Sequence, residues 1–137
     1  MSQTAPRIRH GIDLVHVPRF AEVLRDREAF EAAVFTDDER AYCNRFPDPA
    51  PHFAARFAAK EATLKAHGIG IMATGVDRKL REVEVVRVGT APTLALSGKP
   101  AAEAERLGVT DTSVSLTHDG DHAMATVMLL ADEGDAS

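Results

Sequence analysis

The sequence predicts one globular domain that combines helices with β-strands, and three observations support this prediction. The chain has 137 residues, of which 45% are hydrophobic and 27% are charged, so it can bury a core without a second domain. Strong helix formers crowd the segment 51–70, which predicts one long helix. Residues 113–118 alternate in polarity before an Asp-Gly turn, and residues 122–130 return as an apolar strand, which is the pattern of a β-hairpin.

The beginning of the chain predicts a strand followed by a helix. β-Branched residues and partial alternation indicate a strand over residues 8–15, and residues 1–7 are expected to form a loose arm. Pro18 suits the first turn of a helix, and apolar residues at helical spacing extend this helix to about residue 34.

The middle of the chain leads into and out of the long helix. A capping box at 36–39 (Thr-x-x-Glu) predicts a short helix to about residue 45, and prolines within 47–51 predict a loop after it. The glycines of the segment 68–70 supply the stop for the long helix. The segment 71–79 is expected to be a loop with little regular structure.

The remaining elements before the hairpin are short. Valines that alternate with charged residues predict a strand over 83–88, and a second strand over 93–96 follows it. The alanine-rich segment 98–107 predicts a helix that Gly108 stops. The acidic end, 132–137, is expected to be a loose tail, so that residues 1–137 form one domain with loose ends.

The long helix carries polar residues in two different settings. One polar face contains Arg56, Lys60, Thr63 and His67. Glu61 and Lys65 lie elsewhere, in the seam between a bulky apolar stripe and an alanine-rich sector, where an unpaired charge is costly. They form either a structural i,i+4 ion pair, worth about 0.3–0.5 kcal/mol, or part of a functional site.

Two residues of the predicted strands have a structural and a functional interpretation. Asp13 lies among apolar residues, so its carboxylate needs a hydrogen-bonding partner or a cation, unless it caps a neighbouring turn or helix. His118 lies at a strand end beside the hairpin turn, where a histidine is more often a surface residue than a catalytic one. No second histidine has the spacing that would make a zinc site with it.

The composition argues against several classes of protein. A net charge of −5 argues against a nucleic-acid binder held by an overall basic field. Cys43 is the only cysteine, which excludes an intrachain disulfide and suits a reducing compartment. No apolar run approaches the roughly 18 residues of a membrane span, and the N-terminus lacks the apolar core of a signal peptide. We therefore expect a cytoplasmic protein without a membrane or nucleic-acid partner.

Three segments together resemble the holo-acyl-carrier-protein synthases, the short, single-domain 4'-phosphopantetheinyl transferases. The resemblance extends from about residue 8 to residue 130, and its central motif is highly specific. The matching residues are 11–15 (Gly-Ile-Asp-Leu-Val) with Arg19 and Phe20, 56–62 (Arg-Phe-Ala-Ala-Lys-Glu-Ala) with Lys65 and Gly68, and 114–118 (Val-Ser-Leu-Thr-His) with Ala123 and Ala125.

This resemblance implies an activity, a fold and a metal. Enzymes of the family transfer 4'-phosphopantetheine from coenzyme A to a serine of an acyl carrier protein, for fatty acid biosynthesis, and release adenosine 3',5'-bisphosphate. The implied fold is α+β, with a small antiparallel sheet around the long helix, in a homotrimer whose active sites lie between subunits. Asp13 and Glu61 match the family's Mg²⁺ ligands, and two carboxylates in apolar settings suit this cation.

The resemblance and the residue chemistry together give further roles. With Asp13 and Glu61, Lys65 is expected to be catalytic, because a lysine one turn beyond Glu61 can reach a phosphate. The residues expected to bind coenzyme A are Arg56, Lys60, Lys65, Gly68, Thr117 and His118. Arg19 and Arg25 are candidates for docking the acidic carrier protein.

Several alternatives stay open at this point. The acceptor of the serine proton is Glu61, a metal-bound water or a carboxylate of the segment 37–39. The chain departs from the family's pattern at Arg9, where a glycine is frequent, at Leu80-Arg81, where an aromatic residue is common, and at His67, where a bulky apolar residue is usual. The competing functions are a transferase specialised for a secondary-metabolite carrier and a non-catalytic homologue that binds only coenzyme A or a carrier.

Overall fold

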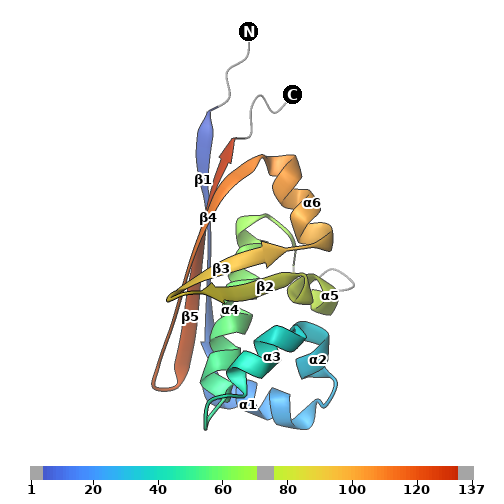
Figure 1. Ribbon diagram of the computed structural model, residues 1–137, viewed down its shortest axis with the longest axis vertical. Helices are drawn as coiled ribbons and strands as arrows, with labels where there is room; N and C mark the ends of the chain where they lie inside the picture. The colour runs from blue at the N-terminus through green and yellow to red at the C-terminus, as the bar shows by residue number, and fades with distance from the viewer. Residues whose placement is uncertain (1–4, 71–75, 133–137) are drawn as a thin grey trace.

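The computed structural model describes residues 5–70 and 76–132, in which five strands and six helices are arranged with the longest helix, α4, at the centre (Figure 1). The elements in chain order are β1 (Pro6–His16), α1 (Val17–Asp26), α2 (Phe30–Val34), α3 (Asp37–Cys43), α4 (Ala50–Ala66), α5 (Val76–Arg81), β2 (Val83–Val88), β3 (Ala91–Leu96), α6 (Gly98–Leu107), β4 (Val109–Asp119) and β5 (His122–Asp132).

The strands form two antiparallel sheets. One sheet has the order β1-β5-β4, and the other consists of β2 and β3. Helix α4 packs lengthwise against β1 and β5, while the β2–β3 sheet crosses on its other side. In Figure 1, α1, α2 and α3 gather at the lower end of α4, and α6 lies at the upper end. The predicted α+β class is confirmed, and a second small sheet is added to it.

Most predicted elements are confirmed, and the boundaries differ by a few residues. The capping box that starts α3 is formed, because Thr36 Oγ1 accepts from the Glu39 N–H while the Glu39 carboxylate accepts from the Thr36 N–H. Gly108 ends α6 in the left-handed conformation, as expected. The loose ends predicted over 1–7 and 132–137 were too long, since β1 begins at Pro6 and β5 extends to Asp132.

Three predictions about local structure were wrong. The helix expected over 18–34 is two helices, because six positions separate Leu24 from the next apolar anchor, Phe30, and the chain turns between them. The loop expected over 71–79 includes the first residues of α5; residues 71–75 lie outside the described part. The hairpin turn is shifted by one residue, because Gly120, with φ of 57°, takes the first central position and Asp121 the second.

Helix α4 is almost completely buried. From Phe53 to Ala66, only Phe57, Glu61 and Lys65 are not fully buried, and their spacing of four residues places them on one stripe. The supposed polar face lies in the interior instead, since Arg56, Lys60, Thr63 and His67 are each at most 4% exposed. The small alanine side chains explain this burial, because they let both sheets approach the helix closely.

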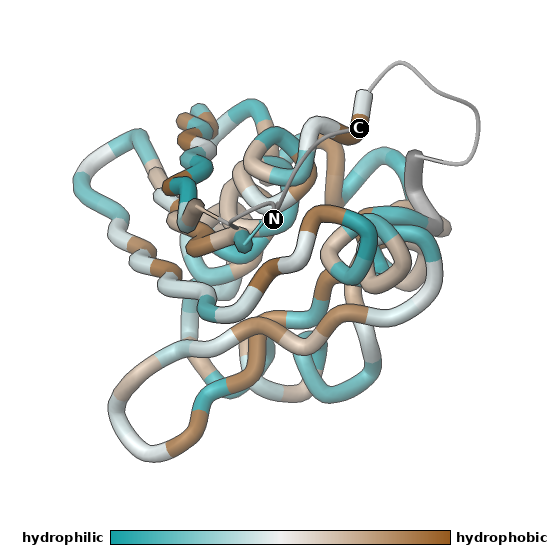
Figure 2. Tube along the Cα trace, turned by 90° about the horizontal axis from the view of Figure 1, so that it is seen from above, coloured by the Kyte–Doolittle hydropathy of each residue, from teal (hydrophilic) through white to brown (hydrophobic). Residues whose placement is uncertain are grey.

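The sheet β1-β5-β4 has an inner face and an exposed outer face. Hydrophobic and hydrophilic residues alternate along part of this sheet, as Figure 2 shows from above, whereas the central strand β5 is mainly apolar on both faces. On β1, Gly11 and Val15 are buried, whereas the residues between and beside them are more exposed. Large apolar side chains nevertheless lie on the outer face: Ile8, Ile12, Leu14, Met128 and Leu130. No helix within residues 5–70 and 76–132 has both the length and the apolar character needed to cross a bilayer.

Candidate active site

An acidic cleft opens where the end of β1 meets α1, α2 and α4. Its volume is about 330 Å³, and Asp13 and Glu61 lie in its lining. The rest of the lining is mainly apolar and includes Phe20, Phe30 and Phe57. Two carboxylates therefore face a largely apolar space, which raises the electrostatic cost of ionising both.

Lys65 is bonded to the Asp13 carboxylate and acts on Glu61 through its charge. Its Nζ donates to Asp13 Oδ1 at 3.0 Å and to the Ile12 carbonyl at 3.1 Å. The Asp13 side chain is 12% exposed, and that of Lys65 is 41% exposed. Burial, and next the charge of Asp13, raise the pKa of Glu61 to about 7, while Lys65 acts in the opposite direction. The three predicted catalytic residues thus lie together.

A close contact between β1 and α4 brings these residues together. Gly11 lies against the α4 backbone, where an added Cβ would stand 1.9 Å from the Ala62 carbonyl oxygen and 3.0 Å from the Ala66 nitrogen. Glu61 and Lys65 immediately precede those two alanines, and Asp13 follows Gly11 by two positions on the same strand face. Glycine at position 11 is therefore what lets the carboxylate of the strand reach the charged groups of the helix.

The pair of carboxylates fits a hard divalent cation. Within the described residues, no group of three or more His, Cys, Asp or Glu side chains could hold a metal. Magnesium, however, commonly takes only one or two protein carboxylates and completes its shell with water and phosphate oxygens. Asp13 and Glu61 supply this donor set, and the repulsion that raises the pKa of Glu61 is what a cation would relieve.

A second hollow, the arginine pocket, lies between α3, α4 and β4 and has a volume of about 300 Å³. Arg56, Thr117 and His118 all border it, so three of the predicted coenzyme A ligands share one pocket. The guanidinium group of Arg56 stands 4.1 Å from the centre of the Tyr42 ring, and its buried Nε has no hydrogen-bond partner. Arg87 also borders the pocket, with its guanidinium 5.7 Å from the same ring.

The sequence analysis missed the aromatic and basic partners in this pocket. Tyr42 and Arg87 come from α3 and β2, and no local pattern in those segments distinguishes them. His52 packs edge-to-face on His118 with ring centres 5.2 Å apart, and its pKa is lowered by burial and then by the neighbouring His118. Arg45 adds a third guanidinium group near the Tyr42 ring, at 5.7 Å.

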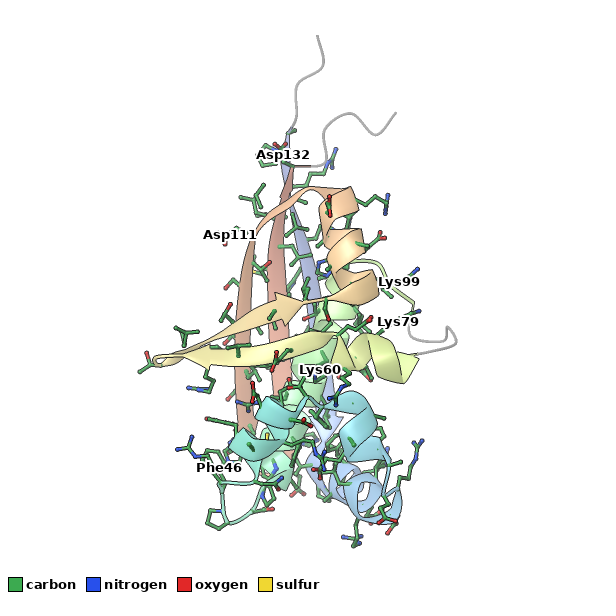
Figure 3. All side chains as sticks on the ribbon, turned by 45° about the vertical axis from the view of Figure 1, so that its right-hand side comes forward. Phe46, Lys60, Lys79, Lys99, Asp111 and Asp132 are labelled. Atoms are coloured by element: carbon green, nitrogen blue, oxygen red, sulfur yellow. The ribbon has the colours of Figure 1, made fainter. Side chains whose placement is uncertain are left out.

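The prediction that Lys60 binds coenzyme A was wrong. Its side chain is fully buried, and its Nζ donates to Glu39 Oε1 at 2.7 Å and to the carbonyls of Leu80 at 3.0 Å and Val83 at 2.6 Å. An ammonium group has three donors, so none is left for a phosphate. Figure 3 shows Lys60 in the interior, between α3 and β2.

The ion pair of Lys60 and Glu39 removes Glu39 from the candidates for accepting the serine proton. Both oxygens of the Glu39 carboxylate are engaged, because Oε1 accepts from Lys60 and the Thr36 N–H, and Oε2 accepts from the Val85 N–H. The neighbouring Asp37 projects outward, with its side chain 88% exposed, towards Arg40 at 3.9 Å. The carboxylates of the segment 37–39 do not border the acidic cleft, so they do not fit the role of base there.

The structure separates the arginines of α1 and places Gly68 apart from both hollows. Arg19 borders the acidic cleft, whereas Arg25 does not and pairs at 3.6 Å with Asp26. Arg27, which the sequence analysis left out of the docking set, borders the cleft as well. Gly68 follows α4 with φ of 73°, a left-handed conformation that suits a helix end, and it is not among the residues around the cleft or the arginine pocket.

The two hollows border the same outer sheet face. A third hollow, of about 390 Å³, lies on this face and is lined by both Leu14 and Thr117. Leu14 also borders the acidic cleft, and Thr117 also borders the arginine pocket. The exposed apolar face therefore runs from one half of the predicted site to the other.

Comparisons with known proteins agree with this geometry. A family model described as the 4'-phosphopantetheinyl transferase superfamily matches residues 9–127. A relative from Anaeromyxobacter dehalogenans, named holo-[acyl-carrier-protein] synthase, is 44% identical in an alignment of 123 positions that covers 87% of this chain and 92% of the relative.

Solved structures of holo-acyl-carrier-protein synthases are also similar to this chain. A Chronobacterium ammoniagenes structure described as an ACPS-CoA complex is 32% identical with a TM-score of 0.80, over 91% of this chain and 98% of that one. A Bacillus anthracis holo-(acyl-carrier-protein) synthase in complex with CoA (3',5'-ADP) is 26% identical with a TM-score of 0.73, over 93% and 99% of the chains. With the family model covering nearly all of the described residues, this chain belongs to the 4'-phosphopantetheinyl transferase superfamily.

Proposed function

We propose that this enzyme transfers the 4'-phosphopantetheine group of coenzyme A to a serine hydroxyl of an apo acyl carrier protein. The observation that carries the proposal is that Asp13 and Glu61 both line the acidic cleft, with Lys65 bonded to Asp13. Support comes from the superfamily and from relatives whose names state synthesis of holo acyl carrier protein or binding of coenzyme A.

The reaction is a substitution at phosphorus. The serine oxygen bonds to the β-phosphorus, the bond from that phosphorus to the bridging oxygen breaks, and adenosine 3',5'-bisphosphate leaves. Asp13 and Glu61 would hold Mg²⁺, which when bound supplies stabilisation for negative charge on the pyrophosphate oxygens. Lys65 adds a positive charge beside the same oxygens, because its Nζ already lies 3.0 Å from Asp13 Oδ1.

The protein side chains also position the nucleotide and accept the proton. Arg56, Thr117 and His118 are proposed to hold the phosphates and base of coenzyme A in the arginine pocket, where Arg56 Nε lacks a partner. Glu61 is our candidate for the carboxylate that accepts the serine proton, because it borders the acidic cleft and the carboxylates of the segment 37–39 do not. Gly68 remains a proposed contact at the end of α4.

A homotrimer is proposed to complete each site. Asp13 and Thr117 border different hollows of one chain, yet both hollows reach the exposed outer sheet face. A second copy on that face would cover its apolar side chains and bring one chain's acidic cleft towards the other's arginine pocket. We place this enzyme in the cytoplasm and in fatty acid biosynthesis, because its lone Cys43 is a buried free thiol and carrier proteins serve that pathway.

Mass spectrometry of a carrier protein tests the proposal directly. Purified enzyme is incubated with coenzyme A, Mg²⁺ and a panel of apo carriers from fatty acid and secondary metabolism. We expect a mass gain of one phosphopantetheine group on at least one carrier, and a loss of this gain when its serine is changed to alanine. Binding of coenzyme A without transfer to any carrier would favour a non-catalytic homologue, and transfer only to secondary-metabolite carriers would revise the pathway.

A further inference from the structure

The buried pair of Lys60 and Glu39 stands directly beside the proposed catalytic carboxylate. Both side chains are 0% exposed, and Lys60 precedes Glu61 in the same helix. Consecutive helical residues point about 100° apart, so whatever fixes the direction of Lys60 also fixes the direction in which Glu61 leaves the helix.

The contacts of this pair fix α4 against three other elements. Lys60 Nζ binds the last turn of α5 through the Leu80 carbonyl, the start of β2 through the Val83 carbonyl, and α3 through Glu39. Glu39 is itself held by the N–H of Thr36 and that of Val85. All three donors of Lys60 and both carboxylate oxygens of Glu39 are engaged, and each outside partner of the pair belongs to a segment other than α4.

A second contact fixes α4 on its opposite side. There Gly11 of β1 touches the backbone at Ala62, leaving no room for a Cβ. Glu61 lies between these two fixed points, one residue after Lys60 and one residue before Ala62. A rotation of α4 about its axis would have to break the bonds of Lys60 or push Gly11 away, so the direction of Glu61 is determined from both sides.

We propose that Lys60 and Glu39 are positioning residues that hold the Glu61 carboxylate beside Asp13, an inference that rests on the proposed function. Stability alone is a weak reason for such a pair, because apolar residues of similar volume often replace a buried ion pair without loss. Residues that orient a metal ligand typically affect metal affinity by about tenfold to a hundredfold when they are changed. The pair therefore belongs to the catalytic apparatus without touching substrate.

The test measures metal binding without turnover. The double variant Lys60→Met/Glu39→Gln removes both charges together, so neither is left buried alone, and the introduced amide oxygen can still accept from the Thr36 N–H. Binding of Mn²⁺, which like Mg²⁺ prefers oxygen ligands, is measured by electron paramagnetic resonance of the free ion, with coenzyme A present and no carrier protein. All proteins are compared well below their unfolding temperatures.

We expect the double variant to bind Mn²⁺ about tenfold to a hundredfold more weakly than the wild type. Its kcat should fall while its KM for carrier protein stays the same, since α1 is untouched. Leu107→Ala, a large-to-small change in a buried residue of α6, is the control and should leave Mn²⁺ affinity unchanged. If the double variant does not fold, Lys60→Arg takes its place, because it keeps both charges paired while a planar guanidinium cannot reproduce the three bonds of the ammonium group, and a loss in the same direction is expected.

Two outcomes would overturn the positioning role. One is wild-type Mn²⁺ affinity in the folded variant, and the other is an equal loss of affinity in Leu107→Ala, which would mean general loosening of the core. A wild-type protein that neither binds Mn²⁺ nor modifies any carrier would contradict the proposed function itself, which makes the two failures distinguishable.

Discussion

Lys60 and Glu61 are neighbours in one helix, and each lies beside a charged partner, yet their surroundings differ completely. Lys60 and Glu39 are sealed from solvent, and every hydrogen-bonding group of the pair is used. Glu61 and Asp13 border a cleft, and their mutual repulsion is only partly offset by Lys65. In our proposal, the partly offset charge at the accessible cleft belongs to the reacting site, and the fully paired charge in the interior supports it.

The largest effect should come from breaking the sealed pair on one side only. Lys60→Met leaves the Glu39 carboxylate buried without its counter-ion, so we expect a loss of about 3–5 kcal/mol in the free energy of unfolding. Lys65→Met removes the same group from a side chain that is 41% exposed, so this control should cost at most about 1 kcal/mol. Urea unfolding measures both, and equal losses would contradict the contrast between the two pairs.

At the acidic cleft we expect the opposite pattern, in which a substitution of Glu61 lowers activity and does not lower stability. Glu61→Gln keeps the shape of the side chain but removes its charge, so phosphopantetheine transfer should fall by at least about a hundredfold. Unfolding should need the same or more free energy, because a repulsion with Asp13 is removed. Glu105→Gln, at an exposed position of α6, is the matched control, and transfer by Glu61→Gln at the control's rate would contradict the assignment.

The raised pKa of Glu61 gives a pH dependence with a definite sign. In the folded protein this pKa is about 7, against an ordinary value of 4.5, so the folded state binds the proton more tightly. The stability gained from the tighter binding of this proton by Glu61 is therefore fully present below about pH 4.5, and it is lost as the pH rises through about 7. Solvent screens this half-buried group, so we expect about 1–2 kcal/mol.

Unfolding of metal-free protein across this pH range measures the effect. The free energy of unfolding is compared between wild type and Glu61→Gln, since the subtraction cancels the other titrating groups. The difference should change in favour of the variant as the pH rises from about 4.5 to 7. A difference that stays constant over this range would show that Glu61 has an ordinary pKa.

The sequence predicted the elements well because their patterns are local. The capping box of Thr36 and Glu39 and the stop at Gly108 are set by residues within one helical turn, and both are formed as expected. The turn at Gly120 was misplaced by one residue, because Asp119-Gly120 and Gly120-Asp121 both suit a two-residue hairpin loop and only strand register distinguishes them.

The environment of the polar residues on α4 was the main error, and its cause is not local. A helical projection places Lys60 and Arg56 on one face, but it does not show that α3 and β2 cover that face. The stripe of Phe57, Glu61 and Lys65 stays partly exposed, and two of its residues border the cleft that Asp13 of β1 also lines. Such facts depend on contacts between segments far apart in the chain, which periodicity does not encode.

His67 shows the same limit at a position where the sequence analysis expected a departure from the family's pattern. Its ring is 1% exposed and Nδ1 lies 2.7 Å from the Thr63 carbonyl, while Nε2 has no partner. Arg9, another departure, donates from Nε to the Ala66 carbonyl at 2.8 Å and so helps to satisfy the end of α4. Both substitutions therefore act on the helix end, and neither reaches the acidic cleft.

The smallest expected effect is a difference in the KM for carrier protein between substitutions of two arginines of α1. Arg19 borders the acidic cleft and Arg25 does not, so Arg19→Glu should raise the KM for an acidic carrier protein more than Arg25→Glu does. An exposed charge pair is worth about 1 kcal/mol at most, which corresponds to roughly a fivefold change in KM. The KM for coenzyme A should not change, and the difference between the two variants should shrink as salt is added, because exposed charges are screened. Equal effects of the two substitutions on the carrier would mean that docking depends on the overall charge of α1, and the cleft would then have no special part in receiving the carrier.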